Sequence, residues 1–172
     1  MPPKQTTIRP RAHQDDGAIA SVIEAAFGGQ AEVALVEALR RDGDMVLERV
    51  AEEAQGGLVG HIAFSRLSAE GAGQSLRAVA LAPLAVAPAL QRKGIGDALT
   101  RTALTDLRNA GEEIAVVLGH PAYYPRFGFS NLQAKRLEAP FSGASFMALE
   151  LRPGALADHR WRITYARAFE TG

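Results

Sequence analysis

A short loop with two glycines, Gln91–Gly96, constrains the fold of this chain more than any other segment. It follows an almost wholly apolar run, Leu76–Val86, and precedes a segment in which apolar residues recur at every fourth position: Ile95, Leu99, Ala103 and Leu107. A shorter apolar run, Ile114–Leu118, comes next. Apolar runs of this length are typical of buried strands, and the four-residue spacing is typical of an amphipathic helix. The pattern predicts a strand, a crossover helix and a second, parallel strand.

Pro83 interrupts the first of these runs at a position where a strand would need a backbone donor. The proline therefore predicts a β-bulge. A bulge here would leave the backbone groups of Leu84, Ala85 and Val86 free to pair with an extended ligand. The alternative is that Pro83 simply marks the end of the strand.

The rest of the chain alternates between helical and strand-like patterns. Apolar residues at helical spacing predict one helix behind Asp15 and Asp16, ending at Phe27, and another over Ala31–Arg41. The turn at Gln55–Gly57 predicts an antiparallel hairpin between two strand-like runs, Met45–Ala51 and Leu58–Leu67. Strands are expected over two further segments, Ser145–Leu151 and Trp161–Phe169.

Length and composition favour one ordinary domain over the 172 residues, 1–172. The formal net charge is zero, which argues against a nucleic acid or an anionic membrane as partner. The chain has no cysteine, and no histidine pair has the spacing of a helical metal site, so no metal is expected. Met1–Thr7 lacks the apolar core of a signal peptide, and no run is long enough for a membrane helix, which predicts a cytoplasmic protein.

The glycine loop has the features of an anion site. Helix N-termini carry unpaired backbone N–H groups and partial positive charge, and Gly94 and Gly96 allow a ligand to approach them closely. Arg92 and Lys93 add charge beside the helix. A dinucleotide fingerprint would need a small residue where Leu99 stands, and the Gly-Lys-Ser/Thr of a P-loop is absent. The alternative is a plain glycine turn flanked by two solvated basic residues.

Several motifs together resemble a known family. Leu84–Pro88 running into Gln91–Gly96 resembles the acyl-CoA-binding motif of the GCN5-related N-acetyltransferase (GNAT) superfamily. Val117–Phe129, Val59–Ile62 and Tyr165–Phe169 are similar to a bacterial subgroup of predicted acetyltransferases, the YhbS-like proteins. The resemblance implies an α/β fold with a mixed, mostly antiparallel sheet. The sheet is splayed between two parallel strands and carries helices on both faces.

The resemblance also implies acetyl-CoA as the cofactor, lying in the gap between the strand that contains Pro83 and the strand that begins at Ile114. The backbone of Leu84, Ala85 and Val86 would pair with the pantetheine arm and the acyl group. The residues expected around the pyrophosphate are Gln91, Arg92, Lys93, Gly94, Ile95, Gly96 and Asp97.

Acyl transfer to an amine requires a neutral amine, stabilisation of the developing oxyanion, and a proton for the departing thiolate. The resemblance implies Tyr124 as the proton donor, because it stands four residues before the Gly128-Phe129 pair. Tyr123 is the alternative donor. A second alternative is that both tyrosines are aromatic residues of the core with no catalytic role. The short turn Gly119–Ala122 departs from many relatives, which have an asparagine and a longer helix before this tyrosine.

A base is also needed to deprotonate the amine, and the family has no fixed position for it. His61 is the leading candidate, since an imidazole accepts protons near neutral pH and its predicted strand borders the cleft. A histidine hydrogen-bonded within the fold is the alternative. His120 and Glu32 are further candidates, although His120 is also explained as part of the turn and Glu32 as part of a solvated helix face.

The sequence thus predicts an N-acetyltransferase that moves an acetyl group from acetyl-CoA to a primary amine of a small molecule or peptide. The alternatives are an acyl-CoA-binding sensor or interaction module without catalysis, and an acyltransferase for longer acyl chains. The acceptor is expected between the helices of 18–41 and two loops, Ser68–Ser75 and Leu132–Ser142. A homodimer that pairs through an exposed sheet edge or through the final strands is a further prediction.

Overall fold

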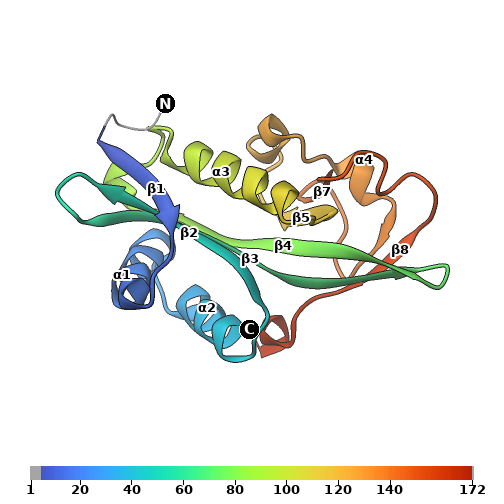
Figure 1. The fold of residues 1–172 in the computed structure, drawn as a ribbon, viewed down its shortest axis with the longest axis horizontal. Helices are drawn as coiled ribbons and strands as arrows, with labels where there is room; N and C mark the ends of the chain where they lie inside the picture. Colours follow the sequence, from blue (N-terminus) through green and yellow to red (C-terminus); the bar gives the residue numbers. More distant parts are fainter. Residues whose placement is uncertain (1–4, 172) are drawn as a thin grey trace.

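The computed structural model describes residues 5–171, which form one sheet with helices on both faces (Figure 1). The strands are β1 (Thr6–Pro10), β2 (Met45–Glu53), β3 (Leu58–Gly71), β4 (Gln74–Val86), β5 (Ile114–Leu118), β6 (Leu137–Glu138), β7 (Phe146–Glu150) and β8 (Trp161–Thr164). The helices are α1 (Asp16–Phe27), α2 (Ala31–Arg41), α3 (Ile95–Asn109) and the short α4 (Asn131–Ala134). Short 3₁₀ turns include η3 (Tyr124–Phe127) and η4 (Arg167–Thr171).

The sheet is mixed and mostly antiparallel. Its order is β1-β2-β3-β4-β5-β7, with β8 pairing with β3 and with β6. The β4–β5 and β6–β8 pairs are parallel, and the other strand pairs are antiparallel. The predicted fold class and the strand, crossover helix and strand unit of β4, α3 and β5 are therefore confirmed.

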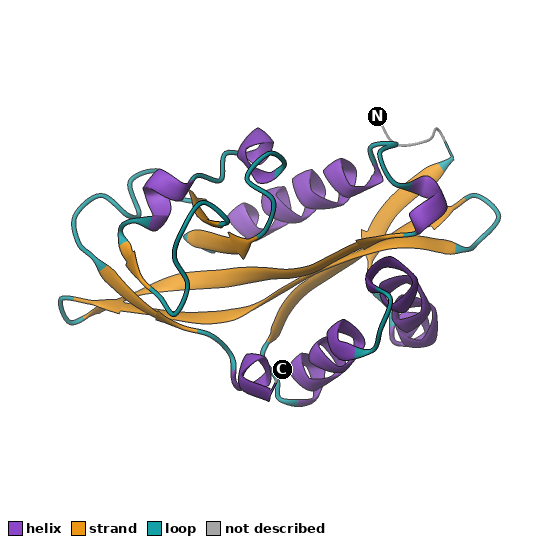
Figure 2. Cartoon of the chain, turned by 180° about the vertical axis from the view of Figure 1, so that it is seen from behind, coloured by secondary structure: helices purple, strands orange, loops and turns teal. Residues whose placement is uncertain are grey.

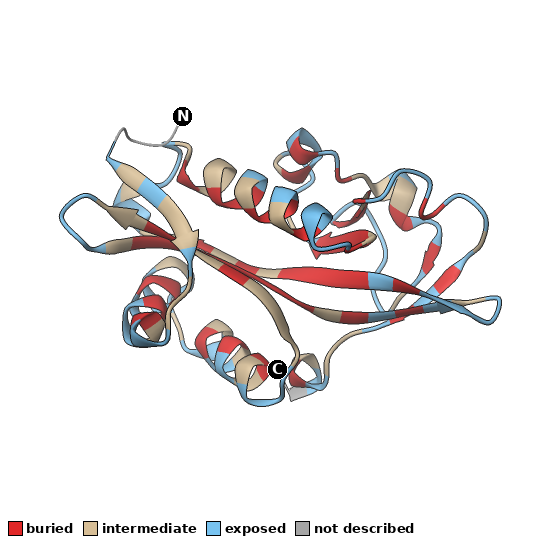
Figure 3. Ribbon diagram, in the orientation of Figure 1, coloured by how far each residue is buried: buried red, intermediate tan, exposed pale blue. Residues whose placement is uncertain are grey.

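Apolar side chains hold a helix layer against each face of the sheet (Figure 2). Leu99 and Leu107 of α3 pack on one face, and Ile19 and Ile23 of α1 pack on the other, together with α2. Helices α1 and α3 follow the 3.6-residue repeat, so their buried stripes face the sheet and their exposed residues face outward (Figure 3). A third cluster, which includes Trp161 and residues of β4, β5 and β7, fills the space beneath the C-terminal segment.

The strand that contains Pro83 is bulged, as predicted. The register with β3 shifts between Ile62, which pairs with Leu84, and Phe64, which pairs with Leu81. β4 continues to Val86, so Pro83 does not end the strand. A bulge inserts one extra residue and thereby exchanges the faces of all later side chains. As a result Leu81 and Leu84 both face α3 although they are three positions apart, an odd number.

The sheet separates just beyond this bulge. β4 and β5 pair from Ala78 with Ile114 to Leu81 with Val117, and no further. Among residues 5–171, the last residues of β4 therefore have β3 on one side and no strand on the other. The predicted splay lies between these two parallel strands.

Two expectations about the chain outside this region were wrong. The last strand ends at Thr164, and Phe169 lies in η4, where it packs edge to face on Tyr165 with ring centroids 5.2 Å apart. The expected loop Ser68–Ser75 is instead the end of the long β3–β4 hairpin, in which Gly71 pairs with Gln74. Local strand pairing extends to a two-residue turn there, so this segment lies far from the bulge.

Met1–Lys4 and Gly172 lie outside the described residues, and the prediction about a signal peptide rests partly on them. Within residues 5–171, no helix combines the length and apolar character needed to cross a membrane. Over the same residues, no cluster of three or more His, Asp and Glu side chains is arranged to hold a metal ion.

Candidate active site

A cleft of about 910 Å³ opens where β4 ends and α3 begins. Its walls come from three segments: the end of β4, the glycine loop with the first turn of α3, and the turn after β5. The lining residues are Leu84, Val86, Leu90, Gln91, Arg92, Lys93, Gly94, Ile95, Gly96, Asp97, His120, Tyr123 and Arg126. Nine of the predicted cofactor-binding residues thus meet in one cleft, and Ala85 is the one that does not.

The bulge decides which residues of β4 reach this cleft. The N–H of Ala87 donates to the carbonyl of Val59 at 2.8 Å. In an antiparallel pair every second residue bonds to the neighbouring strand, so Ala87 and Ala85 direct their backbone groups toward β3. Leu84 and Val86 therefore direct their own backbone groups away from β3, toward the side where β5 no longer pairs. The Gln91 side chain donates to the Val86 carbonyl at 3.1 Å. Ala85 has the opposite orientation, and its side chain is buried against α1.

The glycine loop presents a row of backbone donors to the cleft. Arg92 and Gly94 have φ values of 64° and 89°, and this left-handed geometry turns the chain into α3. The first N–H bonded back into the helix is that of Ala98, which donates to the Gly94 carbonyl at 3.1 Å. For the residues that the structure describes, no acceptor is found for the N–H groups from Arg92 to Asp97. Such a row at a helix N-terminus suits an anion.

Gly96 keeps this part of the cleft open. A Cβ atom added there would lie 3.0 Å from the Tyr123 hydroxyl, 3.7 Å from Leu84 and 3.8 Å from Val86. The missing side chain thus leaves a channel between the helix end and the unpaired edge of β4. A phosphate-bearing ligand with an extended arm fits these residues, because the donors are backbone groups and the walls of the channel are apolar.

Tyr123 closes one side of the cleft through a polar triad with Asp97 and Arg126. Its hydroxyl donates to the Asp97 carboxylate at 2.8 Å, and the Arg126 guanidinium lies 4.4 Å from the ring centroid. Arg126 is also 3.5 Å from the same carboxylate. Burial, and then the bond to Asp97, raise the pKa of Tyr123 well above its ordinary value. Asp97 therefore offers the cleft its backbone N–H, while its side chain is engaged by Tyr123.

Arg126 was not predicted as a site residue. A basic residue within the aromatic turn Tyr123–Phe129 was the signal available in the sequence. Its position over the Tyr123 ring depends on how the turn folds back onto α3, which sequence spacing does not define. Together with Arg92 and Lys93, it places positive charge around the mouth of the cleft.

Tyr124 lies behind the cleft wall. Its side chain packs over Gly119, where an added Cβ would clash with the ring, and its ring centroid is 5.1 Å from that of Tyr123 and 5.8 Å from that of Phe129. Burial raises the pKa of Tyr124 to about 12. In the described part of the chain its hydroxyl has no hydrogen-bond partner. The structure therefore brings Tyr123 to the cleft and keeps Tyr124 one ring further back.

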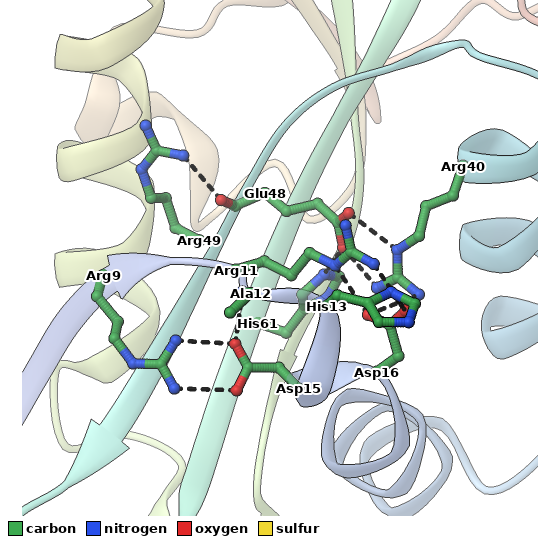
Figure 4. A network of polar contacts seen from close by, with 10 residues as sticks. All are labelled: Arg9, Arg11, Ala12, His13, Asp15, Asp16, Arg40, Glu48, Arg49 and His61. Atoms are coloured by element: carbon green, nitrogen blue, oxygen red, sulfur yellow. Dashed lines mark hydrogen bonds and ion pairs between the residues drawn. The ribbon is translucent and has the colours of Figure 1, made fainter.

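His61 lies on the other face of the sheet, fully buried on β3 opposite Ala85 (Figure 4). Its Nε2 is 2.8 Å from Glu48 of β2, and Arg40 of α2 binds the same carboxylate at 2.7 Å and 3.0 Å. Burial alone would raise the pKa of Glu48, but the bonds from His61 and Arg40 lower it to about 2. The carboxylate is therefore charged at neutral pH. His61 Nδ1 is buried without a partner among the described residues.

Neither Glu48 nor Arg40 was predicted from the sequence. A glutamate inside an apolar strand is a signal of a buried ion pair, but its partners come from another strand and from a helix. The two remaining candidate bases lie in different places. His120 lines the cleft, whereas Glu32 lies in the first turn of α2 and does not.

Comparison with known proteins gives consistent results. The model of the Acetyltransferase (GNAT) domain family matches residues 7–132. The uncharacterized N-acetyltransferase YhbS of Escherichia coli is 36% identical over 122 residues, which cover 71% of this chain and 72% of that protein. The uncharacterized N-acetyltransferase YjhQ of Escherichia coli is 41% identical over 117 residues, covering 67% and 64% of the two chains.

Solved structures show the same similarity in three dimensions. The crystal structure of YhbS from Escherichia coli in complex with CoA superposes with a TM-score of 0.89 at 31% identity, covering 99% of this chain and 94% of the other. A GNAT family acetyltransferase from Brucella melitensis in complex with acetyl-CoA gives a TM-score of 0.78 at 36% identity, with 95% and 97% covered.

Proposed function

Since this chain belongs to the GNAT acetyltransferase family and is an acyl-CoA-dependent enzyme, we propose that it acetylates a primary amine of a small molecule or peptide. The observation that carries the proposal is the cleft itself. A row of free N–H groups at the start of α3 lies beside the unpaired edge of β4. This arrangement suits a ligand with phosphates at one end and an extended arm at the other.

Within the cleft, each segment has a proposed role in holding acetyl-CoA, which supplies the activated acetyl thioester when bound. The N–H groups from Arg92 to Asp97 bind the pyrophosphate, and the side chains of Arg92 and Lys93 add positive charge. Leu84 and Val86 pair through their backbone with the pantetheine arm and cover it with their side chains. Ala85 is left out of this set, because its backbone is directed toward β3.

Tyr124 is proposed to donate the proton that the departing thiolate needs. With its pKa at about 12, the phenol keeps its proton at neutral pH. The hydroxyl of Tyr123 is instead bound to Asp97, so it donates only after that bond opens. Tyr124 therefore stays the preferred proton donor and Tyr123 the alternative, although the side chain of Tyr123 is the one that lines the cleft.

His61 is proposed to accept the proton of the amine through an intervening water, because the side chain is too deeply buried to touch an acceptor. Glu48 holds Nε2, which leaves Nδ1 as the nitrogen with a free site. Arg40 keeps the Glu48 carboxylate in place. The pair of Glu48 and Arg40 therefore fixes the orientation of the imidazole.

The test is a transfer assay with acetyl-CoA and a panel of amines: an arylalkylamine, an alkylamine, a polyamine, an amino acid and a peptide with a free N-terminus. CoA thiol release and the mass of the product are followed together, and reactions without amine give the rate of hydrolysis. Acetylated product from at least one amine is expected. Binding of acetyl-CoA without product from any amine would contradict the proposal. A cytoplasmic location and a homodimer remain predictions.

A further inference from the structure

The end of β5 exposes an apolar side chain on the face opposite the cofactor cleft. Leu118 is 51% exposed, whereas every other residue of β5 is buried. Val117 is the last residue paired with β4 and faces α3, so Leu118, its neighbour, faces the other side. Two residues later His120 lines the cofactor cleft. Leu118 therefore stands where the gap between β4 and β5 opens on this second face.

Aromatic residues continue from Leu118 along the same face. Leu118 pairs with Phe146 of β7, whose ring lies 6.5 Å from that of Phe141. Phe141 is 40% exposed and meets Tyr165 edge to face at 5.4 Å. Tyr165 in turn packs on Phe169 of η4, which contacts α2 (Figure 1). We name Leu118, Phe141, Phe146 and Tyr165 the aromatic wall.

The segment that follows Phe141 is bonded to Asn131 of α4. The Asn131 amide donates to the Gly143 carbonyl at 2.5 Å and to the Phe146 carbonyl at 3.0 Å. Both bonds lie on the C-terminal side of Phe141, so they hold the point where its loop joins β7. The ring of Phe141 is itself in contact with the rings of Phe146 and Tyr165, which limits the directions in which it can point.

The aromatic wall carries no charged side chain. On the same face of the sheet, the buried carboxylate of Glu48 is paired with Arg40 at 2.7 Å and with His61 at 2.8 Å. A polyamine would find no carboxylate on the wall to bind its second charge, and an acidic amine would find no cation. The exposed ring of Phe141, which meets Tyr165 edge to face, instead offers a further stacking position to another ring.

We propose that the acceptor is a primary amine joined by a short alkyl chain to an aromatic ring, an inference that rests on the proposed function. The ring stacks on Phe141 and Leu118 while the amine enters the gap at the end of β5. The amine nitrogen bonds to the carbonyl carbon of the acetyl group as the carbon–sulfur bond breaks. The bonding electron pair leaves with sulfur, which takes up one proton, and the amine gives up one proton.

The test compares phenethylamine, butylamine and spermidine as acceptors. We expect kcat/KM for phenethylamine to exceed that of each other amine by about ten-fold or more. Phe141→Ala and Leu118→Ala should each raise KM for phenethylamine by about ten-fold and leave the Kd of acetyl-CoA unchanged. Both side chains are exposed, so truncation should not prevent folding, which thermal unfolding verifies.

The matched control is Leu132→Ala, which truncates another exposed leucine, 74% accessible, on α4. Leu132 begins the loop in which the sequence placed the acceptor, but in the structure it lines a separate hollow with Gln133 and Leu156. This variant should behave as the unmodified protein. Preference for spermidine or butylamine would overturn the inference and leave the proposed function intact, as would equal effects of Phe141→Ala and Leu132→Ala. Failure to acetylate any amine would overturn both.

Discussion

Replacing Gly96 with leucine should abolish acetyl-CoA binding without unfolding the protein. A Cβ at this position already lies 3.0 Å from the Tyr123 hydroxyl and within ordinary contact of Leu84 and Val86. The three further carbons of leucine would therefore fill the channel between α3 and β4. We expect the Kd of acetyl-CoA to rise at least about 100-fold, which corresponds to about 2.7 kcal/mol. Isothermal titration calorimetry measures the change directly.

The stability of the same variant should change little. Gly96 is the second residue of α3, and replacing a helical glycine stabilises a helix by about 0.5–1 kcal/mol. Displacing Tyr123 from Asp97 costs about 0.5–1.5 kcal/mol, because one hydrogen bond is lost. These terms nearly offset each other, so the melting temperature should move by no more than about 4 °C.

Gly17→Leu provides the matched control. Gly17 is likewise the second residue of its helix, α1, but no atom of the described chain lies within 4 Å of a Cβ added there. This variant should bind acetyl-CoA as the unmodified protein does. Unchanged affinity in Gly96→Leu, or an equal loss in Gly17→Leu, would refute the steric reasoning about the channel.

Three further predictions concern single side chains. Tyr124→Phe should lower kcat by about 100-fold with little change in the Kd of acetyl-CoA, and a larger loss of kcat in Tyr123→Phe would reassign the proton donor. Glu48→Gln should lower the free energy of unfolding, measured with urea near neutral pH, by about 3 kcal/mol. Folding lowers the pKa of Glu48 from 4.5 to about 2, so the stability that its charge contributes is present above pH 4.5 and is lost as pH falls toward 2. The difference in free energy of unfolding between Glu48→Gln and the unmodified protein should therefore shrink over this range. A difference that stays constant would count against the ion pair. Arg92→Gly should raise the free energy of unfolding by about 1 kcal/mol, because the φ of Arg92 is 64° and glycine adopts this left-handed geometry without strain. The same variant should raise the Kd of acetyl-CoA more than Lys93→Gly does at equal salt concentration.

The sequence by itself determined the elements around the cleft. The four-residue spacing from Ile95 to Leu107 defines α3, and the glycines before it are needed where the chain turns tightly into that helix. Pro83 lacks a backbone donor, which places the bulge within one strand. These features are local, because they depend on the periodicity and backbone chemistry of residues adjacent in the chain. The resemblance of the same motifs to the GNAT family added the cofactor.

Only the tertiary structure decided which side chains face the cleft. Tyr123 and Tyr124 are adjacent and chemically equal, and the packing of the turn on α3 and Gly119 brings the first to the cleft and the second behind it. The partners of His61 come from β2 and α2, at separations that no local pattern encodes. The bulge excludes Ala85 because it fixes the face and the hydrogen-bonding edge of each later residue in β4. Orientation of this kind depends on long-range packing and register, and sequence patterns specify neither.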